Sequence, residues 1–254
     1  MSIGSRLLFG ILVLGSANLG TAESPRVLIY TRNGKGFVHD NIPSCVEALT
    51  EVCREAGIET EVSDDWGVFT PDRLARYRAI VFANTNNEAF ENEAQRSAFQ
   101  SFIRSGGGFV GIHSATGSER SWRWYWSLIG GTFAWHHPLQ SFRVRVVDRE
   151  HPAVSFLPDP WEWRDEFYYV KERNRNVRVL LAGEQASLAK PGKPPAGLAD
   201  LPEPYPLAWC HEFEGGRSFY TALGHLKEHY KDPLFRRHLL EAIRWAARLD
   251  SGSR

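Results

Sequence analysis

Short runs of apolar residues alternate with amphipathic segments through the first half of the chain. The runs AIVFA and FVGI contain no polar positions, and RVLIY is apolar after its first residue, which is typical of parallel strands buried on both faces. The segments between them carry apolar side chains at helical spacing. The expected strands are residues 26–30, 60–63, 79–83 and 109–112, and the expected helices are residues 41–56, 71–76 and 91–104. This order predicts βαβ units, and therefore a mainly parallel sheet with right-handed crossovers.

The second half of the chain is richer in strand patterns. Residues 142–147, FRVRVV, alternate apolar and polar positions as a half-exposed strand does. An aromatic run interrupted by acidic residues covers 161–170, and a proline-rich stretch at 187–206 is expected to form a surface loop. Further strands are expected at 177–182, 207–213 and 218–223, and a hairpin turn joins the last two. One helix is expected to begin near residue 122, and a final helix is expected at 232–249.

Polar side chains follow several of the buried strands. The Gly-rich stretch at 106–117, GGGFVGIHSATG, ends its strand in a histidine and a serine. Ligands of open α/β sheets bind beyond the carboxyl ends of the strands. Because parallel strands end at the same edge, we expect the loops after the first, third and fourth strands to form one site. The residues in these loops are His39, Asn84, Thr85, His113 and Ser114.

Charge and cysteine content narrow the function classes. The chain has 30 Lys and Arg against 30 Asp and Glu, and no basic run, so nucleic acid is not expected as a partner. The three cysteines, Cys45, Cys53 and Cys210, are expected to pack as small apolar side chains, and no chemistry is assigned to them.

The first 22 residues have the pattern of a secretory signal peptide. Arg6 provides the positive charge, residues 7–14 form an apolar run, and small residues lead to a cleavage site near Ala22. The apolar run is too short to span a bilayer, so no membrane span is expected. We therefore predict a protein exported to the periplasm or the extracellular space.

Six short motifs follow one another in a fixed order along the chain. The motifs are GFVHD at 36–40, GGGFVGIHS at 106–114, Phe133 with His137-Pro138, His151-Pro152, DEFY at 165–168, and GRSFY at 216–220 with Gly224-His225. Together they resemble the ThuA-like (trehalose utilisation) family. The resemblance covers residues 25–249, which we expect to form one domain.

The resemblance implies a fold and a substrate class. The fold is α/β, a flavodoxin-like three-layer sandwich similar to class I glutamine amidotransferases, with a mainly parallel central sheet and a β-rich C-terminal half. The associated substrates are disaccharides such as trehalose and their keto derivatives. Amidotransferases carry a nucleophilic cysteine after the fourth strand, where this chain has His113, so amidotransferase chemistry is not expected. Ser114 does not lie in a G-x-S-x-G motif, so a serine hydrolase is not expected either.

Two mechanisms could use the motif residues. In one, histidines and Glu166 bind a divalent metal, zinc or manganese, that polarises a sugar carbonyl or activates water. In the other, a metal-free site uses a histidine and Glu166 to move protons beside a keto group, with Tyr168 donating to an oxyanion. The alternative to an enzyme is a non-catalytic sugar-binding module on the same fold. The sequence leaves open whether the chain forms a homo-oligomer.

The candidate residues follow from these hypotheses. The expected catalytic residues are His113, Glu166, Tyr168 and His225. The expected substrate-binding residues are His39, Asn84, Thr85, Ser114, Trp135 and His137. The candidate metal ligands are His39, His113, His137 and His225. Trp135, Trp161 and Trp163 could stack on a pyranose, but packing in the core is the favoured role for each of them. His137 is preferred to His136 only from the His-Pro pattern, and if 161–170 is a strand, Glu166 and Tyr168 share a face while Asp165 points away.

Overall fold

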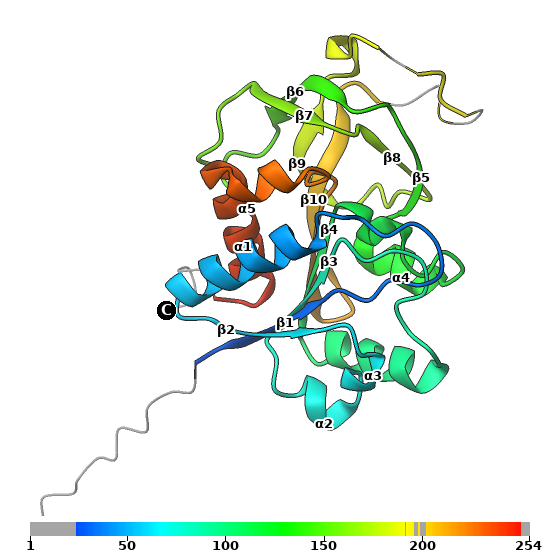
Figure 1. The fold of residues 1–254 in the computed structure, drawn as a ribbon, viewed down its shortest axis with the longest axis vertical. Helices are drawn as coiled ribbons and strands as arrows, with labels where there is room; N and C mark the ends of the chain where they lie inside the picture. Colours follow the sequence, from blue (N-terminus) through cyan, green and yellow to red (C-terminus); the bar gives the residue numbers. More distant parts are fainter. Residues whose placement is uncertain (1–23, 191, 196–197, 199–201, 250–254) are drawn as a thin grey trace, which may run out of the picture.

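A nine-stranded sheet forms the centre of the protein in a computed structural model that describes residues 24–190, 192–195, 198 and 202–249 (Figure 1). The strand order is β2-β1-β3-β4-β11-β10-β9-β6-β7. The strands are β1 (Arg26–Tyr30), β2 (Glu59–Ser63), β3 (Ala79–Ala83), β4 (Gly108–Ile112), β6 (Gln140–Val146), β7 (Trp161–Asp165), β9 (Arg178–Gly183), β10 (Tyr205–Phe213) and β11 (Gly216–Thr221). A separate two-stranded sheet pairs β5 (Thr132–His136) with β8 (Tyr168–Lys171).

The sheet is parallel in one half and antiparallel in the other. Strands β2, β1, β3, β4 and β11 are parallel, whereas every later pair in the order is antiparallel. Four antiparallel steps separate β11 from β7, so β7 runs in the same direction as the parallel strands. The carboxyl ends of β1, β4, β11 and β7 therefore lie at the same edge of the sheet.

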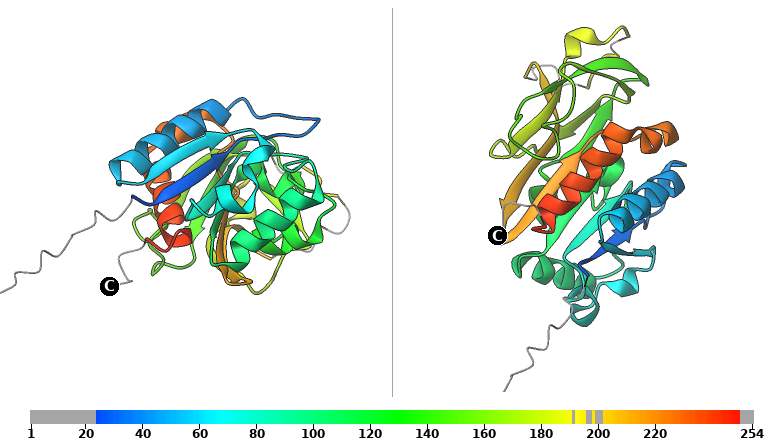
Figure 2. Two further views of the ribbon diagram at one scale, coloured as in Figure 1. Left: turned by 90° about the horizontal axis from the view of Figure 1, so that it is seen from below. Right: turned by 90° about the vertical axis from the view of Figure 1, so that its left-hand side faces the viewer.

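Helices cover both faces of the parallel half (Figures 1 and 2). Helices α1 (Ile42–Glu55) and α5 (Pro233–Ala246) pack against each other on one face. Helices α2 (Pro71–Leu74), α3 (Glu93–Arg104) and α4 (Arg123–Ile129) lie on the other. On that face, the Phe82 ring of β3 contacts Phe99 and Tyr125 with ring centroids 5.7 and 5.8 Å apart. Aromatic burial of this kind contributes strongly to core stability.

The mixed α/β architecture expected from the sequence is confirmed. All expected strands form, and β6 alternates buried and exposed residues along its whole length, as its pattern predicts. Cys45, Cys53 and Cys210 are buried free thiols, as expected. No helix within the described residues is long and apolar enough to cross a membrane. The segment interpreted as a signal peptide, residues 1–22, lies outside the described residues.

The aromatic run at 161–170 forms two strands in different sheets, which the sequence does not indicate. Strand β7 ends at Asp165, Glu166 and Phe167 form the connection, and β8 begins at Tyr168. Trp161 and Trp163 are 5% and 6% exposed and contact each other with ring centroids 4.4 Å apart. Core packing, the favoured role of these two tryptophans, is therefore confirmed, and their burial does not support stacking on a sugar.

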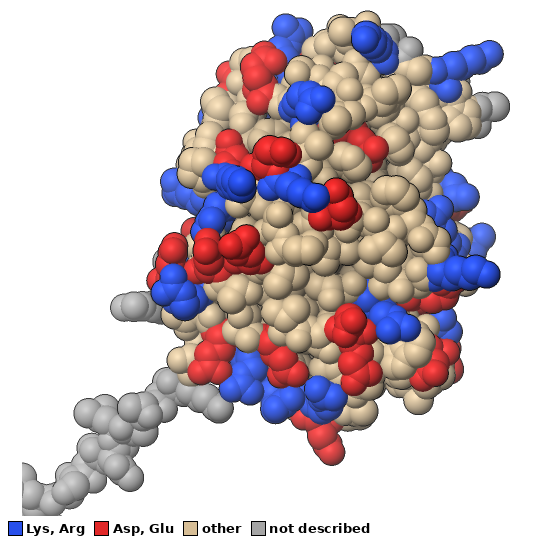
Figure 3. Space-filling view, viewed as in Figure 1, with Lys and Arg blue, Asp and Glu red and all other residues tan. Residues whose placement is uncertain are grey.

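Charged side chains of both signs are intermixed on the face shown in Figure 3. This distribution agrees with the balance of 30 basic and 30 acidic residues. It offers no extended surface of one sign to a polyanion on that face.

Candidate functional site

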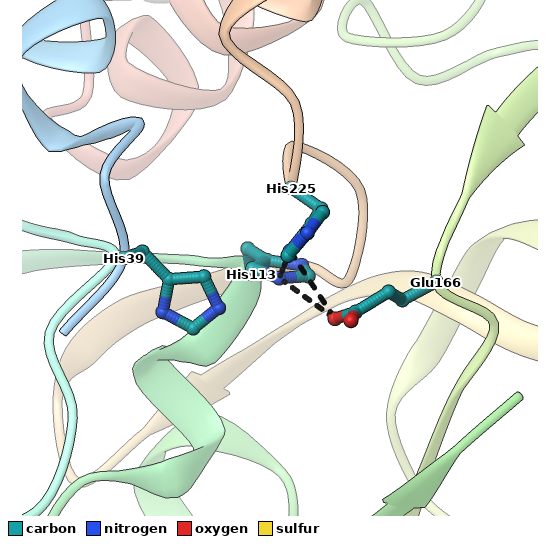
Figure 4. A group of neighbouring side chains, drawn as sticks. All are labelled: His39, His113, Glu166 and His225. Atoms are coloured by element: carbon teal, nitrogen blue, oxygen red, sulfur yellow. Dashed lines mark hydrogen bonds and ion pairs between the residues drawn. The ribbon is translucent and has the colours of Figure 1, made fainter. Parts of the chain in front are cut away.

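Three histidines and one glutamate converge at the carboxyl edge of the sheet (Figure 4). His39 follows β1, His113 follows β4, His225 follows β11, and Glu166 follows β7. One ligand atom from each of the four lies within 4.8 Å of those of the other three. The chain thus brings residues up to 186 positions apart in sequence into one cluster, which we call the histidine cluster.

His113 has an unusual backbone conformation and a fixed ring. Its φ of +48° lies in the left-handed region, where a side chain costs about 1–2 kcal/mol. The residue makes the sharp turn from β4 into a short 3₁₀ helix, His113–Gly117. Its Nδ1 lies 2.7 Å from the carbonyl oxygen of Ala222, and the Tyr220 hydroxyl donates to the His113 carbonyl at 2.8 Å. Since a carbonyl only accepts, Nδ1 carries the proton and Nε2 presents its lone pair to the cluster.

The acceptor atoms of the cluster face one another at short distances. His113 Nε2 lies 3.6 Å from Glu166 Oε2 and 3.3 Å from His225 Nδ1. His225 Nδ1 in turn lies 3.2 Å from the same Glu166 oxygen. A lone pair on Nε2 and a carboxylate oxygen repel each other unless an N–H proton or a cation lies between them. The arrangement therefore calls for a proton or a metal cation at its centre.

His39 completes the cluster from the β1 side. Its ring centroid lies 4.9 Å from that of His113 and 5.4 Å from that of His225, nearly perpendicular to both. The side chain is 6% exposed, and its Nδ1 is buried with no hydrogen-bond partner among the described residues. An unpartnered buried nitrogen is costly in a protein core. Figure 4 shows that the other ring nitrogen of His39, Nε2, is the one that faces the cluster.

Burial and neighbouring histidines lower the pKa values of two imidazoles in the cluster. Burial, assisted by the nearby His113 and His225, lowers the pKa of His39 to about 3. Burial, followed by His113, also lowers the pKa of His225 below its ordinary value. For Glu166, burial favours a higher pKa, but the neighbouring side chain of His113, followed by His225 and His136, lowers the pKa below its ordinary value. The shifts favour neutral rings at His39 and His225 and an ionised carboxylate at Glu166, the forms that bind metals.

Asp165 holds two members of the cluster in place. This fully buried carboxylate accepts from the backbone N–H groups of Glu166 at 2.8 Å, of Gly224 at 2.8 Å and of His225 at 3.3 Å. It also accepts from Trp163 Nε1 at 2.9 Å. Asp165 thus fastens the end of β7 to the loop after β11. As expected, it does not itself enter the cluster.

A cavity of about 270 Å³ opens beside the cluster. This volume is slightly below the range of about 300–1,000 Å³ that holds drug-sized ligands, and it suits a group of monosaccharide size. Phe37, which is 65% exposed, forms part of its rim and contacts His39 edge-on. Its lining is Phe37, His39, Asn86, Ser114, Gly117, Arg120, Phe133, His136, Glu166 and Tyr168.

Several expected site residues line this cavity. Tyr168 is buried against His113, with ring centroids 4.3 Å apart, and burial followed by the charge of Glu166 raises its pKa well above the ordinary value. Tyr168 is therefore a neutral hydroxyl. Ser114 is 3% exposed, and its Oγ is buried with no hydrogen-bond partner among the described residues.

His136, rather than His137, faces the cluster. His136 Nδ1 lies 3.5 Å from Glu166 Oε1, and His136 pairs with Tyr168 across the β5–β8 ladder. The ring of His137 instead accepts from Gly192 N at 2.8 Å and lies 3.1 Å from the Tyr169 hydroxyl. Successive side chains of a strand point to opposite sides, so only one of the two can face the cavity. The expectation of His137 as a metal ligand is not supported by its position.

Trp135, Asn84 and Thr85 also lie outside the cavity lining. Trp135 stacks on Tyr169 at 5.8 Å, on the same side as His137. Asn84 is fully buried and donates to the Tyr230 hydroxyl at 2.8 Å, and Thr85 shares a hydrogen bond of 2.8 Å with Ser118. Their expected role in substrate binding is not supported, because the polar atoms of Asn84 and Thr85 are used inside the fold and Trp135 packs on Tyr169 and His137.

Sequence reasoning missed four residues that the structure places at the site. His136 was the alternative left open by the double histidine, and Asn86 lies in a loop already expected at this edge. Asp165 is adjacent to the motif residue Glu166, but its backbone partners come from another element. Arg120 follows a short helix that the apolar pattern does not indicate, and no motif marks it.

A model of the ThuA family, described as trehalose utilisation, matches residues 26–246. The chain therefore belongs to the ThuA family, as its motifs indicated. No curated protein matches the chain.

Solved structures of ThuA-like proteins share the fold. One from Bacteroides uniformis has a TM-score of 0.71 and 24% identity, covering 91% of this chain and 95% of that one. Another from Parabacteroides merdae has a TM-score of 0.66 and 18% identity, covering 89% and 90%. A cytoplasmic protein from Salmonella typhimurium has a TM-score of 0.60 and 13% identity, covering 87% and 98%. At these identities the likeness establishes the fold alone.

The left-handed conformation of His113 leads to a stability prediction. With metal removed by a chelator, His113→Gly should be more stable than His113→Ala by about 1 kcal/mol, because only glycine adopts this φ without a steric cost. The free energy of unfolding in urea measures the difference. The matched pair Ser114→Gly and Ser114→Ala, at a position without a positive φ, should show the opposite order. Equal stability of the two His113 variants would contradict the assignment of strain.

Proposed function

We propose that this protein is a metal-dependent enzyme that acts on a carbohydrate. The observation that carries the proposal is the fixed ring of His113. Its Nδ1–H is held by the Ala222 carbonyl, so its Nε2 lone pair faces the Glu166 carboxylate and His225 at 3.6 and 3.3 Å. Metal-binding histidines in proteins typically donate their other N–H to a carbonyl or carboxylate in this manner.

The donor set fits a divalent cation. Three imidazoles and one carboxylate suit zinc, and also manganese, iron or cobalt. His39, His113, His225 and Glu166 would hold it. A bound divalent cation supplies Lewis-acid polarisation of a sugar carbonyl or activation of a water molecule.

His136 is suited to move protons beside the cluster. Its Nδ1 lies 3.0 Å from the His137 carbonyl oxygen, so Nδ1 carries the proton and Nε2 is the acceptor. The side chain is 37% exposed and lines the cavity, so a bound substrate can reach it. A neutral imidazole near working pH is an effective general base, and Tyr168 offers a neutral hydroxyl as a hydrogen-bond donor to a developing oxyanion.

Membership of a trehalose-utilisation family favours a disaccharide or its keto derivative as the substrate. The cavity supports this choice, because Phe37 and Phe133 add apolar faces to the polar lining. Carbohydrates present apolar C–H faces and hydroxyl edges, and such a mixed lining matches both.

The turn at His113 also bears on which fold the protein has. We propose a relation to class I glutamine amidotransferases, in which helices flank a parallel sheet and the nucleophile follows the fourth strand. His113 occupies that turn here, with its left-handed backbone, and provides a metal ligand in place of a thiol.

Metal content tests the proposal directly. Protein produced in metal-supplemented medium should contain close to one divalent ion per chain by plasma mass spectrometry, and His113→Ala should lose most of it. His137→Ala is the matched control, and its metal content should equal that of the wild type. A wild-type protein without metal would reject the metal centre and leave the metal-free proton-transfer mechanism.

Turnover separates an enzyme from a binding module. With a keto derivative of trehalose as substrate, His136→Ala should lower kcat by roughly 100-fold or more, because it removes a proton acceptor. Its metal content should remain unchanged, since His136 lies outside the histidine cluster. His137→Ala should turn over nearly as fast as the wild type. Binding of the sugar without turnover by the wild type would favour the non-catalytic module.

We also propose that the protein is exported. Expression of the full-length chain in a bacterial host should give a mature protein that begins at Glu23, by N-terminal sequencing of the secreted or periplasmic fraction. Replacing Leu12 by arginine should block this processing, because it interrupts the apolar run. Recovery of the wild-type chain with Met1 intact would contradict export.

A further inference from the structure

A single arginine lines the cavity beside the histidine cluster. Arg120 shares this lining with His136 and Glu166, and it is the one Lys or Arg among the lining residues. The proposed mechanism gives this side chain no task. A cation in the wall of a substrate cavity can bind an anionic group or can be neutralised by a neighbouring carboxylate, and its surroundings distinguish these two cases.

The guanidinium of Arg120 is held in a fixed position. Its Nε donates to the Gly117 carbonyl at 3.0 Å, and one terminal nitrogen donates to Asn86 Oδ1 at 3.2 Å. Asn86 is itself fixed, because its Nδ2 donates to the Phe37 carbonyl at 3.1 Å. The guanidinium carbon lies 5.5 Å from the centre of the Phe133 ring.

Gly117 makes this arrangement sterically feasible. A Cβ added at residue 117 would lie 2.4 Å from Asn86 Oδ1 and 3.1 Å from a terminal nitrogen of Arg120. Any side chain here would therefore push the amide and the guanidinium apart. The absence of a side chain at Gly117 allows Arg120 to lie against Asn86 before a ligand binds. Binding then costs less conformational entropy of the arginine side chain.

The charge of Arg120 is not neutralised within the described part of the chain. No carboxylate there lies within ion-pair distance of it, and its second terminal nitrogen has no hydrogen-bond acceptor among those residues. Arg96, by contrast, pairs with the buried Glu119, the immediate neighbour of Arg120, at 2.9 Å. Glu119 is thus already paired, and Arg120 keeps donors for a ligand.

We propose that, among the disaccharides and keto derivatives of the proposed function, this cavity prefers those that carry a carboxylate, as sugars built from uronic or aldonic acids do, and that Arg120 binds this group. This inference rests on the proposal that the cavity binds a carbohydrate. Arginine matches a carboxylate with two parallel hydrogen bonds, which gives both affinity and orientation. The carboxylate end of the sugar then lies at Arg120 and Asn86, and the reacting end lies toward the histidine cluster.

A phosphate is the less suitable anion for this position. It carries nearly two negative charges at neutral pH and is usually bound by several cations or by the backbone N–H groups of a helix N-terminus. The cavity lining offers one guanidinium and no second Lys or Arg. A single positive charge matches the single negative charge of a sugar acid.

Comparison of acidic and neutral sugars tests the assignment. Binding of glucuronate, glucose and glucose 6-phosphate is measured by calorimetry on the full chain and its variants. The wild type should bind glucuronate more tightly than the other two sugars. Arg120→Gln should weaken glucuronate binding roughly 10- to 100-fold, the range for a lost charge-assisted hydrogen bond, and leave glucose binding unchanged. Arg120→Lys keeps the positive charge but loses the paired N–H groups of the guanidinium. Its affinity for glucuronate should therefore lie between those of the wild type and Arg120→Gln.

Two further variants make the result specific. Arg123→Gln removes an exposed arginine that stacks on Trp126 outside the cavity lining, and it should bind glucuronate as the wild type does. His113→Ala tests whether the carboxylate binds at the cluster, and it should keep the preference for glucuronate over glucose.

Each contrary outcome has a distinct meaning. Equal binding of glucuronate and glucose, or a preference that survives Arg120→Gln, overturns the assignment of Arg120 while the carbohydrate proposal stands. A preference lost in His113→Ala but kept in Arg120→Gln assigns the carboxylate to the cluster. Tighter binding of glucose 6-phosphate overturns the choice of a sugar acid. No binding of any of the three sugars rejects the carbohydrate proposal itself, whatever the metal content.

Discussion

The buried carboxylate of Asp165 joins the two halves of the sheet at the site. It accepts from the N–H groups of Glu166, at the end of β7, and of Gly224 and His225, after β11. The histidines come from the parallel half and Glu166 from the antiparallel half, so the cluster exists only if these two ends are held together. A buried acceptor with four N–H donors is strongly directional, and it fixes the loops more tightly than apolar packing would.

The cluster combines neutral nitrogen donors with one negative charge. Burial suppresses protonation of His39 and His225, and the carbonyl of Ala222 fixes which nitrogen of His113 faces inward. These features work against stability, because a buried carboxylate and buried unpartnered nitrogens are costly. The left-handed backbone of His113 adds to this cost. Such a concentration of unfavourable features at one edge of a sheet is typical of functional sites.

Much of the fold and part of the site could be predicted from local pattern. The buried runs that became β3 and β4 lack polar positions, and β1 is apolar after Arg26, so their strands and the polar residues after them were visible in the sequence. His39 and His113 were found for this reason, whereas Glu166 and His225 came from family motifs. His136 and His137 could not be separated, since the start and pairing of β5 determine which side each one faces.

The sequence by itself determined the alternation of strands and helices, the polar loops at one edge, and the family. Only the tertiary structure decided that β7 returns parallel to β11 after four antiparallel steps, which places Glu166 beside the histidines. It also decided that Trp161 and Trp163 face the core and that Arg120 lies beside Asn86. The physical reason is that side-chain periodicity is local, whereas strand order and loop contacts depend on free energies summed over residues distant in sequence.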